Sequence, residues 1–254
     1  MNPIVHAEDV MGTVVAFDVR GQSAPVARAA IEAAAVWLHW VDATFSTYRP
    51  DSEISRLDRG DLTEDDCHPQ VRHILALCEQ LGAATNGYFD ARAAGRLDPS
   101  GVVKGWSIER ASQMLTAAGC PDHLIDGGGD VRLHGQAGPD TDWQVGVVHP
   151  FRLDAYCAAL HLQEGAVATS GTYQRGFHVI DPHRGRPATD LAAVSVIGAE
   201  LTMTDAYATT ALAMGAAALA WLEGLADHEA MVIDTDGRGR ETTGFCRYRL
   251  EVAA

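Results

Sequence analysis

Residues 202–215 read TMTDAYATTALAMG and have the composition of a helix together with its start. Thr202 or Thr204 can serve as the N-cap, Asp205 then falls in the first turn, and alanine and leucine continue the helix. Asp205 and Thr209 are four positions apart, so their oxygens project from one helix face. A carboxylate and a hydroxyl placed in this way can bind Mg²⁺, which takes few protein ligands and completes its shell with water and phosphate.

The same spacing also has a purely structural interpretation. Asp205 can face the positive end of the helix dipole while Thr209 packs on the next turn. Because the pattern Asp-x-x-x-Thr is common, this stretch does not define a function without support from the rest of the chain.

Composition narrows the setting of the protein. The chain has 254 residues, 47% of them hydrophobic, which is enough for one large domain or two small ones. Its net charge of −15 argues against a nucleic-acid partner, which requires basic patches. The charge is compatible with a phosphate ligand, because a metal ion and backbone N–H groups can offset the negative field at one site.

The sequence also bears on localisation. It contains no apolar run of membrane-spanning length and no basic-then-apolar N-terminus, so we expect neither membrane insertion nor a signal peptide. The five cysteines are odd in number and never spaced as metal-binding pairs. We therefore expect reduced thiols in a cytoplasmic protein.

Strand and helix patterns alternate along the chain, with hairpin-like sections, which predicts an α+β fold rather than a regular parallel α/β sheet. A polar loop is expected over 45–56. Helices are expected over 26–40, 71–86 and 106–119, in addition to the one that opens at 202. Strands are expected over 11–20, 124–125, 131–133, 143–148, 156–162, 166–169, 193–197 and 230–233.

The stretch Asp98-Pro-Ser-Gly101-Val-Val-Lys104-Gly105-Trp106 lies, by this interpretation, just before a helix. Its glycines would allow close backbone approach, the helix N-terminus would offer N–H groups, and Lys104 would supply a positive charge for a phosphate or nucleotide. The spacing differs from that of a Walker motif. A plain loop-to-helix junction is the structural alternative.

A second glycine-rich stretch, Asp126-Gly-Gly-Gly129-Asp130, lies between two strand patterns. It could form an anion-binding nest or a tight turn, and we favour a turn close to a ligand. The pattern Gly-x-Gly-x-x-Gly followed by a helix does not occur there, which argues against a dinucleotide-binding fold.

Residues 168–185 combine hydroxyl side chains, one histidine between apolar residues (His178) and an Asp-Pro turn. His178 is the best candidate for a general base, because it lies where a strand meets a turn. A buried structural histidine is the alternative. The 45–56 loop and Tyr88-Phe89-Asp90 add aromatic rings beside polar groups, which could stack on a flat ring or belong to the core.

Taken in order, these stretches make the sequence similar to the FAD:protein FMN transferase family, the ApbE-type flavin transferases. The similarity extends over nearly the whole chain. It is carried by Met11-Gly-Thr13, Ser46-Thr-Tyr48, residues 51–56, Gly87-Tyr-Phe-Asp90, residues 98–105, Gly127-Gly-Gly-Asp130, Ala168-Thr-Ser-Gly171, His178-Val-Ile-Asp-Pro182 and residues 204–209.

The resemblance implies a single ApbE-like (T-fold-like) domain over residues 1–254, built of two intertwined lobes with FAD and Mg²⁺ in the cleft between them. Such enzymes cleave FAD, attach FMN through a phosphoester bond to a threonine of an acceptor protein, and release AMP. The resemblance places His178 near the reacting phosphate and gives the metal to Gly101 (through its carbonyl), Asp205 and Thr209. The residues implied to line the FAD site are Met11, Tyr48, Tyr88, Phe89, Asp90, Asp98, Lys104 and Val179.

The sequence departs from many relatives between Asp90 and Asp98, where only seven residues lie and a longer insertion is common in the family. This departure bears on the wall of the FAD site and on recognition of the acceptor protein.

Two other functions remain open from the sequence. An Mg²⁺-dependent FAD pyrophosphatase, giving FMN and AMP, would use the same metal ligands and base with water as the nucleophile. A flavin-binding or flavin-delivery protein would need neither a metal nor a base, so the joint presence of Asp205, Thr209 and His178 weighs against it.

Overall fold

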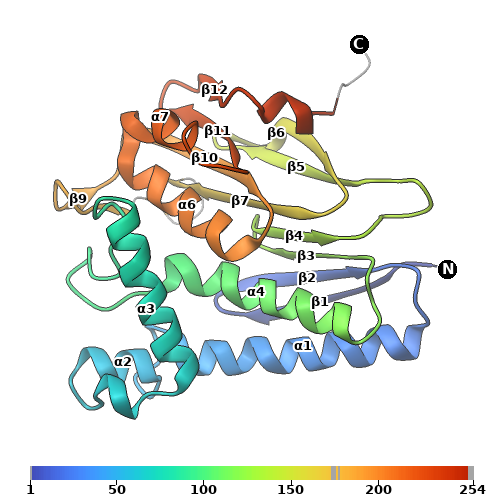
Figure 1. The fold of residues 1–254 in the computed structure, drawn as a ribbon, viewed down its shortest axis with the longest axis horizontal. Helices are drawn as coiled ribbons and strands as arrows, with labels where there is room; N and C mark the ends of the chain where they lie inside the picture. Colours follow the sequence, from blue (N-terminus) through green and yellow to red (C-terminus); the bar gives the residue numbers. More distant parts are fainter. Residues whose placement is uncertain (1, 173–175, 177, 251–254) are drawn as a thin grey trace.

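The computed structural model describes residues 2–172, 176 and 178–250, and its centre is an eight-stranded antiparallel sheet. The strand order is β1-β2-β3-β4-β7-β10-β11-β12, so segments far apart in the sequence become neighbours (Figure 1). The strands are β1 (Ile4–Val10), β2 (Thr13–Val19), β3 (His123–Gly127), β4 (Val131–His134), β7 (Gly165–Gly171), β10 (Leu191–Gly198), β11 (Glu229–Asp234) and β12 (Gly239–Glu241).

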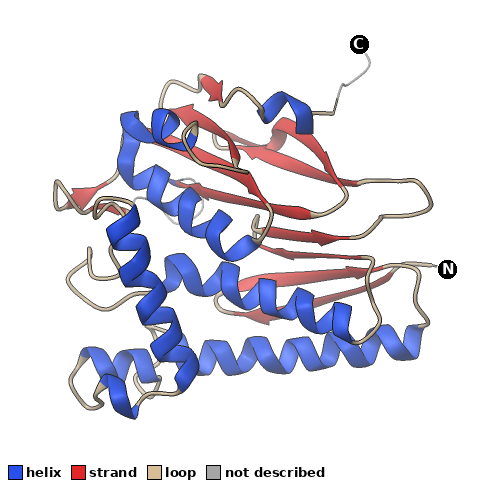
Figure 2. Ribbon diagram, in the orientation of Figure 1, coloured by secondary structure: helices blue, strands red, loops and turns tan. Residues whose placement is uncertain are grey.

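Three long helices lie on one face of this sheet: α1 (Ala24–Phe45), α4 (Ser100–Ala117) and α6 (Leu201–Met214) (Figure 2). Their apolar faces and the strands form the main core, in which Phe17, Leu38 and Ile108 are at most 1% exposed. Burial of such side chains contributes roughly 1.5–3 kcal/mol each. The short helices η2 (Gly215–Ala217) and α7 (Ala218–Leu222) follow α6 and return the chain to β11.

The opposite face of strands β4, β7, β10 and β11 is covered by a hairpin of β5 (Trp143–His149) and β6 (Arg152–Leu162), with the short helix η3 (Phe245–Tyr248). Trp143, Leu160 and Phe245 pack there against side chains of β4, β7, β10 and β11. Strand β10 therefore has packing on both of its faces, which explains why all eight of its residues are buried and apolar or small.

A third cluster of buried side chains lies at the C-terminal end of α1. It joins α2 (Glu53–Asp58), Cys67, which follows the short helix η1 (Glu64–Asp66), and α3 (Pro69–Ala84) to the first turns of α4. The short strands β8 (Ile180–Asp181) and β9 (Arg186–Pro187) form a separate hairpin. The α+β prediction is confirmed, whereas the division into two lobes stays a prediction because α1, α4 and α6 contribute to both the main core and this third cluster.

Several element boundaries differ from the sequence-based expectations. The expected strand over 11–20 is the second half of a hairpin whose turn, at Met11 and Gly12, has φ values of 55° and 69°. The 45–56 loop contains the start of α2, whose cap is Ser52, with its side chain accepting the N–H of Ser55. The structure also contains β8, β9, β12 and α7, which the sequence patterns did not indicate.

The two most consequential corrections concern α4 and α6. Helix α4 begins at Ser100, so the expectation that the Gly101–Gly105 stretch precedes a helix is wrong, and these residues form its first turns. In α6 the N-cap is Glu200, not Thr202 or Thr204, and Asp205 is the fifth helical residue instead of a first-turn residue. Glu200 is the N-cap because its two carboxylate oxygens accept two backbone N–H groups, those of Thr202 and Met203.

Candidate functional site

The contact between α4 and α6 brings together the three residues expected to hold a metal. Asp205 is 4% exposed, and its Oδ2 accepts a hydrogen bond from the Gly105 N–H at 2.9 Å. Thr209, one turn further along α6, has its Oγ1 3.1 Å from the hydroxyl of Ser170 at the end of β7. Gly101 faces the same place, because a Cβ added to it would lie 3.3 Å from Thr209 Cγ2.

Glycine at positions 101 and 105 lets the two helices approach closely. A Cβ on Gly105 would lie 2.6 Å from the Leu201 carbonyl oxygen and 2.8 Å from Asp205 Cβ, distances that real side chains do not adopt. A Cβ on Gly101 would also lie 3.2 Å from the ring of Phe89. The glycines expected to admit a phosphate therefore admit a neighbouring helix.

Lys104 lies on the first turns of α4, and its Nζ contacts Asp130 Oδ2. Asp130 is fully buried and follows the three glycines, and its Oδ1 accepts the N–H of Thr169 at 3.1 Å. The preferred interpretation of the glycines as a turn is confirmed, with φ values of 72° at Gly128 and 97° at Gly129. The turn thus supplies a buried carboxylate that pairs with the lysine.

Asp126, at the other end of this turn, is a second acidic side chain beside the pair. Burial raises the pKa of Asp126, and the nearby charge of Asp130 acts in the same direction, whereas the Gly129 N–H opposes both by donating to Asp126 Oδ1 at 2.8 Å. Two acidic groups and one lysine therefore share a small, largely buried region.

The aromatic residues expected to line an FAD site fall into different environments. Tyr48 is 88% exposed, with the Arg96 guanidinium 5.8 Å from its ring centre. Tyr88 stacks on His183 with ring centres 4.0 Å apart and an interplanar angle of 14°. Phe89 is buried against Gly101 and belongs to the third cluster, which matches the core alternative for that residue.

The two acidic residues expected to line the FAD site each accept a hydrogen bond from a backbone N–H two residues further along the chain. The Oδ1 atom of Asp90 accepts the N–H of Arg92 at 2.7 Å. The Oδ1 atom of Asp98 accepts the N–H of Ser100 at 3.1 Å, at the start of α4. These hydrogen bonds shape the short 90–98 connection.

Met11 and Val179 are both partly buried. Met11 packs against the main core and the third cluster, and the Ser107 hydroxyl lies 3.6 Å from its sulfur. The Val179 carbonyl accepts the N–H of Ala188 at 2.9 Å, which brings the segment before β8 next to the chain after β9.

His178 is exposed, and both its backbone N–H and its Nδ1 lie 3.0 Å from the Gly176 carbonyl oxygen. The contacts of the described residues do not join it to Asp205 or Thr209. Because His178 is exposed, the alternative interpretation as a buried structural histidine is wrong.

Two side chains at this site had no role assigned from the sequence. Ser170 forms a hydrogen bond with Thr209, and Asp130 forms an ion pair with Lys104. The signal for Asp130 was an acidic residue between glycines and an apolar strand, where burial requires a partner. The signal for Ser170 was weaker, because a hydroxyl at a strand end is common.

Two negative observations apply to the described residues, 2–172, 176 and 178–250. No group of three or more His, Cys, Asp or Glu side chains among them could hold a metal ion. The proposed metal ligands include one carboxylate, one hydroxyl and one backbone carbonyl, so they are not such a group. No described helix has both the length and the apolar character needed to cross a membrane.

Solved structures share this architecture. An ApbE protein from Thermotoga maritima superimposes with a TM-score of 0.85 at 20% identity, covering 98% of this chain and 100% of that one. A flavin transferase ApbE from Vibrio cholerae gives 0.83 at 21% identity, covering 97% and 99%. At such low identity these matches establish a shared fold: the mixed helix-and-sheet fold of ApbE proteins.

The sequence matches the ApbE family over residues 11–96 and 91–232, and the chain belongs to that family. A protein of Treponema pallidum named FAD:protein FMN transferase is 31% identical over 174 residues, which cover 61% of this chain and 48% of that protein. One of the same name from Rhodobacter capsulatus is 34% identical over 131 residues, covering 48% and 25%. The chain thus matches about half or less of the length of these relatives.

Proposed function

We propose that this protein is an Mg²⁺-dependent flavin transferase that cleaves FAD, joins FMN to a threonine of an acceptor protein and releases AMP. The observation that carries the proposal is the meeting of Gly101, Asp205 and Thr209 where α4 packs against α6. Membership of the ApbE family and the names of the matched relatives support the same reaction class. We further propose that residues 1–254 act as one catalytic unit.

The donor set fits magnesium. A carboxylate, a hydroxyl and a carbonyl are hard oxygen ligands, and one carboxylate with few protein ligands suits an ion that retains water and binds phosphate. The Gly105 N–H, which in a regular helix would be bonded to the Gly101 carbonyl, also donates to Asp205. That competition weakens the hold on the Gly101 carbonyl and favours its use as a ligand.

Magnesium, when bound, would neutralise charge on the pyrophosphate of FAD. Lys104 would add a positive charge near the phosphates or the flavin, with Asp130 holding it in place. The residues proposed to line the FAD site are Met11, Tyr48, Tyr88, Phe89, Asp90, Asp98 and Val179. Of these side chains, Tyr48 is the most available for stacking, because its ring is almost fully exposed.

In the proposed reaction the hydroxyl oxygen of the acceptor threonine attacks the phosphorus of the FMN moiety. The bond from that phosphorus to the bridging oxygen breaks, and AMP leaves with the bridging oxygen. His178 takes the proton of the attacking hydroxyl. Its exposure supports this role, because the acceptor protein has to reach the base from solvent.

We place the reaction in the cytoplasm. All five cysteines are free thiols, which is typical of proteins in a reducing compartment.

The test is incubation of the protein with FAD, Mg²⁺ and a candidate acceptor domain, followed by intact-mass measurement of the acceptor and detection of AMP. The acceptor should gain the mass of FMN in step with AMP release, and an acceptor with Val in place of the threonine should not. AMP and free FMN without acceptor modification would identify a pyrophosphatase. Saturable FAD binding without AMP would identify a flavin-delivery protein, and absence of FAD binding would overturn the flavin assignment.

A further inference from the structure

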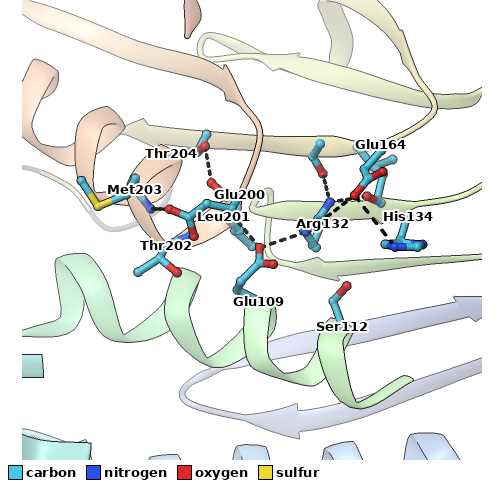
Figure 3. A network of polar contacts seen from close by, with 12 residues as sticks. Glu109, Ser112, Arg132, His134, Glu164, Glu200, Leu201, Thr202, Met203 and Thr204 are labelled. Atoms are coloured by element: carbon cyan, nitrogen blue, oxygen red, sulfur yellow. Dashed lines mark hydrogen bonds and ion pairs between the residues drawn. The ribbon is translucent and has the colours of Figure 1, made fainter. Parts of the chain in front are cut away.

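Glu109 is a buried carboxylate in the middle of α4, on the face that packs against α6 (Figure 3). Its Oε2 accepts a hydrogen bond from the backbone N–H of Leu201, the first residue of α6, at 2.8 Å. The same oxygen lies 2.9 Å from Nε of Arg132 on β4. A buried charge is costly unless it is paired, so a group with two such partners at a helix start points to a positioning role.

The contact at Glu109 is the last of three that step along the two helices at equal intervals. Each advance of four residues along α4 corresponds to four residues back along α6, so the helices run antiparallel in a single register. Four residues span about 6 Å of helix. The three pairs are Gly101 with Thr209, Gly105 with Asp205, and Glu109 with Leu201.

The glycines permit close packing but define the register weakly. Helices normally fix their relative position by interlocking side chains, and glycine has none. A hydrogen bond with one donor and one acceptor, by contrast, can form in only one register. Two such bonds join the helices: the Gly105 N–H donates to Asp205, and the Leu201 N–H, which has no partner within its own helix, donates to Glu109.

The next two backbone N–H groups of α6 do not link it to α4. Those of Thr202 and Met203 are accepted by Glu200, which is attached to the same helix and moves with it. Glu109 belongs to α4 and therefore ties one helix to the other.

Arg132 connects this contact to the sheet. Its NH1 donates to the Leu133 carbonyl and, at 2.9 Å, to the Gly165 carbonyl on β7. Its NH2 lies 3.7 Å from the exposed carboxylate of Glu164. Arg132 is thus hydrogen-bonded to the sheet and forms an ion pair with Glu109, and Glu109 accepts the first backbone N–H of α6 (Figure 3).

We propose that Glu109 is a positioning residue which sets the register of α6 against α4 and thereby the placement of Asp205 and Thr209 relative to the Gly101 carbonyl. Its consequence for metal binding rests on the proposed function, whereas the register is a property of the fold alone. Groups that orient metal ligands typically change metal affinity by about 10–100-fold, and we expect an effect in that range from Glu109, which acts on the ligands through the helix that carries them.

The experiment compares two double variants that both remove the buried charges. Glu109→Leu with Arg132→Met deletes the acceptor for the Leu201 N–H and leaves apolar groups of similar size, which buried ion pairs generally tolerate. Glu109→Gln with Arg132→Met keeps an acceptor oxygen. Glu79→Gln, an exposed glutamate on α3, is the control for loss of one negative charge.

Two quantities are measured: hydrogen exchange of the Gly105 amide by NMR without metal, and the Mg²⁺ concentration that half-saturates FMN transfer. With the leucine double variant we expect Gly105 exchange at least about tenfold faster and a half-saturating concentration at least about tenfold higher. The glutamine double variant should stay within about threefold of the wild type for both, and Glu79→Gln should match the wild type.

Equal behaviour of the two double variants, or unchanged Gly105 exchange in the leucine double variant, would overturn the positioning role. The two hypotheses can also fail separately. If the wild-type protein transfers no FMN, but the two double variants differ in Gly105 amide exchange as expected, the proposed function is refuted and the register inference stands.

Discussion

Asp205 is a buried carboxylate oriented by the backbone of a neighbouring helix. The Gly105 N–H fixes one of its oxygens at 2.9 Å, and Thr209 lies one turn further along the same face. An oriented carboxylate needs little reorganisation when it binds a cation. The proposed metal site is therefore sensitive to charge at one residue and to a hydroxyl at the other.

Asp205→Asn should lower Mg²⁺-dependent activity by more than about 100-fold, because the amide keeps the shape and an acceptor for Gly105 but loses the only charge of the donor set. Thr209→Val, which removes a neutral hydroxyl and keeps the volume, should have a smaller effect. Initial rates over a series of Mg²⁺ concentrations test both. Full activity of Asp205→Asn in the presence of a chelator would refute the metal site.

His178→Ala should lower the turnover number by about 10²–10⁴-fold and leave the dissociation constant of FAD nearly unchanged, because a general base acts on the proton and not on flavin binding. His73→Ala, at an exposed position of α3, is the matched control and should behave as the wild type. An unchanged turnover number in His178→Ala would remove this residue from the mechanism.

At the scale of elements, the crossing of α4 and α6 organises the site. Glycines at 101 and 105 carry no side chain between the helices, and Asp205 and Thr209 take the space that side chains would occupy. Glycine inside a helix costs about 1 kcal/mol relative to alanine, so its presence here reflects packing and not helix formation.

Gly105→Ala should destabilise the protein in spite of its better helix propensity. The added Cβ would meet the Leu201 carbonyl at 2.6 Å, and overpacking of this kind costs about 1–3 kcal/mol, more than the propensity gain of about 1 kcal/mol. Urea unfolding measures the difference. Gly82→Ala on α3 is the comparison. A Cβ at Gly82 would lie 3.3 Å from its nearest neighbour, the Phe89 carbonyl oxygen, so the free energy of unfolding should change less.

For Gly105→Ala we also expect a higher Mg²⁺ requirement, because the clash displaces Asp205. A variant as stable as the wild type and with the same Mg²⁺ requirement would show that the two helices can separate without disturbing the site.

At the scale of the whole molecule, the packed layers of helices and sheet bury polar side chains that must remain neutral or paired. His123 on β3 is fully buried, with Nδ1 2.7 Å from the Cys120 carbonyl and Nε2 2.7 Å from the Ser112 hydroxyl. Both contacts suit a neutral ring. Burial lowers the pKa of His123 to about 4.

This shift predicts loss of stability in acid. As the pH falls below 6.5, the unfolded chain binds a proton at this residue and the folded protein does not, until the pH approaches about 4. His123 should therefore make the protein about 2 kcal/mol less stable at about pH 5 than at about pH 7.5. Urea unfolding of the wild type and of His123→Gln tests this, and equal pH dependence of the two proteins would contradict it.

Much of the architecture was predictable from local pattern. The α+β class and the strands around residues 124, 131, 143, 193 and 230 followed from short alternating apolar runs between turn residues. The start of α4 was placed wrongly because a tertiary contact outweighs a local signal. Helix α4 contains glycines that a local view assigns to a loop, because their contribution lies in packing against α6, which is about one hundred residues away in the sequence.

The sequence by itself determined the chemical groups of the candidate site: a carboxylate and a hydroxyl four residues apart, a lysine among glycines, and a histidine where a strand pattern meets a turn. Their order along the chain determined the family. Only the tertiary structure decided which of them meet, because the antiparallel register of α4 and α6 and the partners of Asp205, Thr209 and Lys104 depend on contacts between distant segments. Side-chain chemistry is local, whereas helix register is set by packing and buried polar pairs across the whole fold.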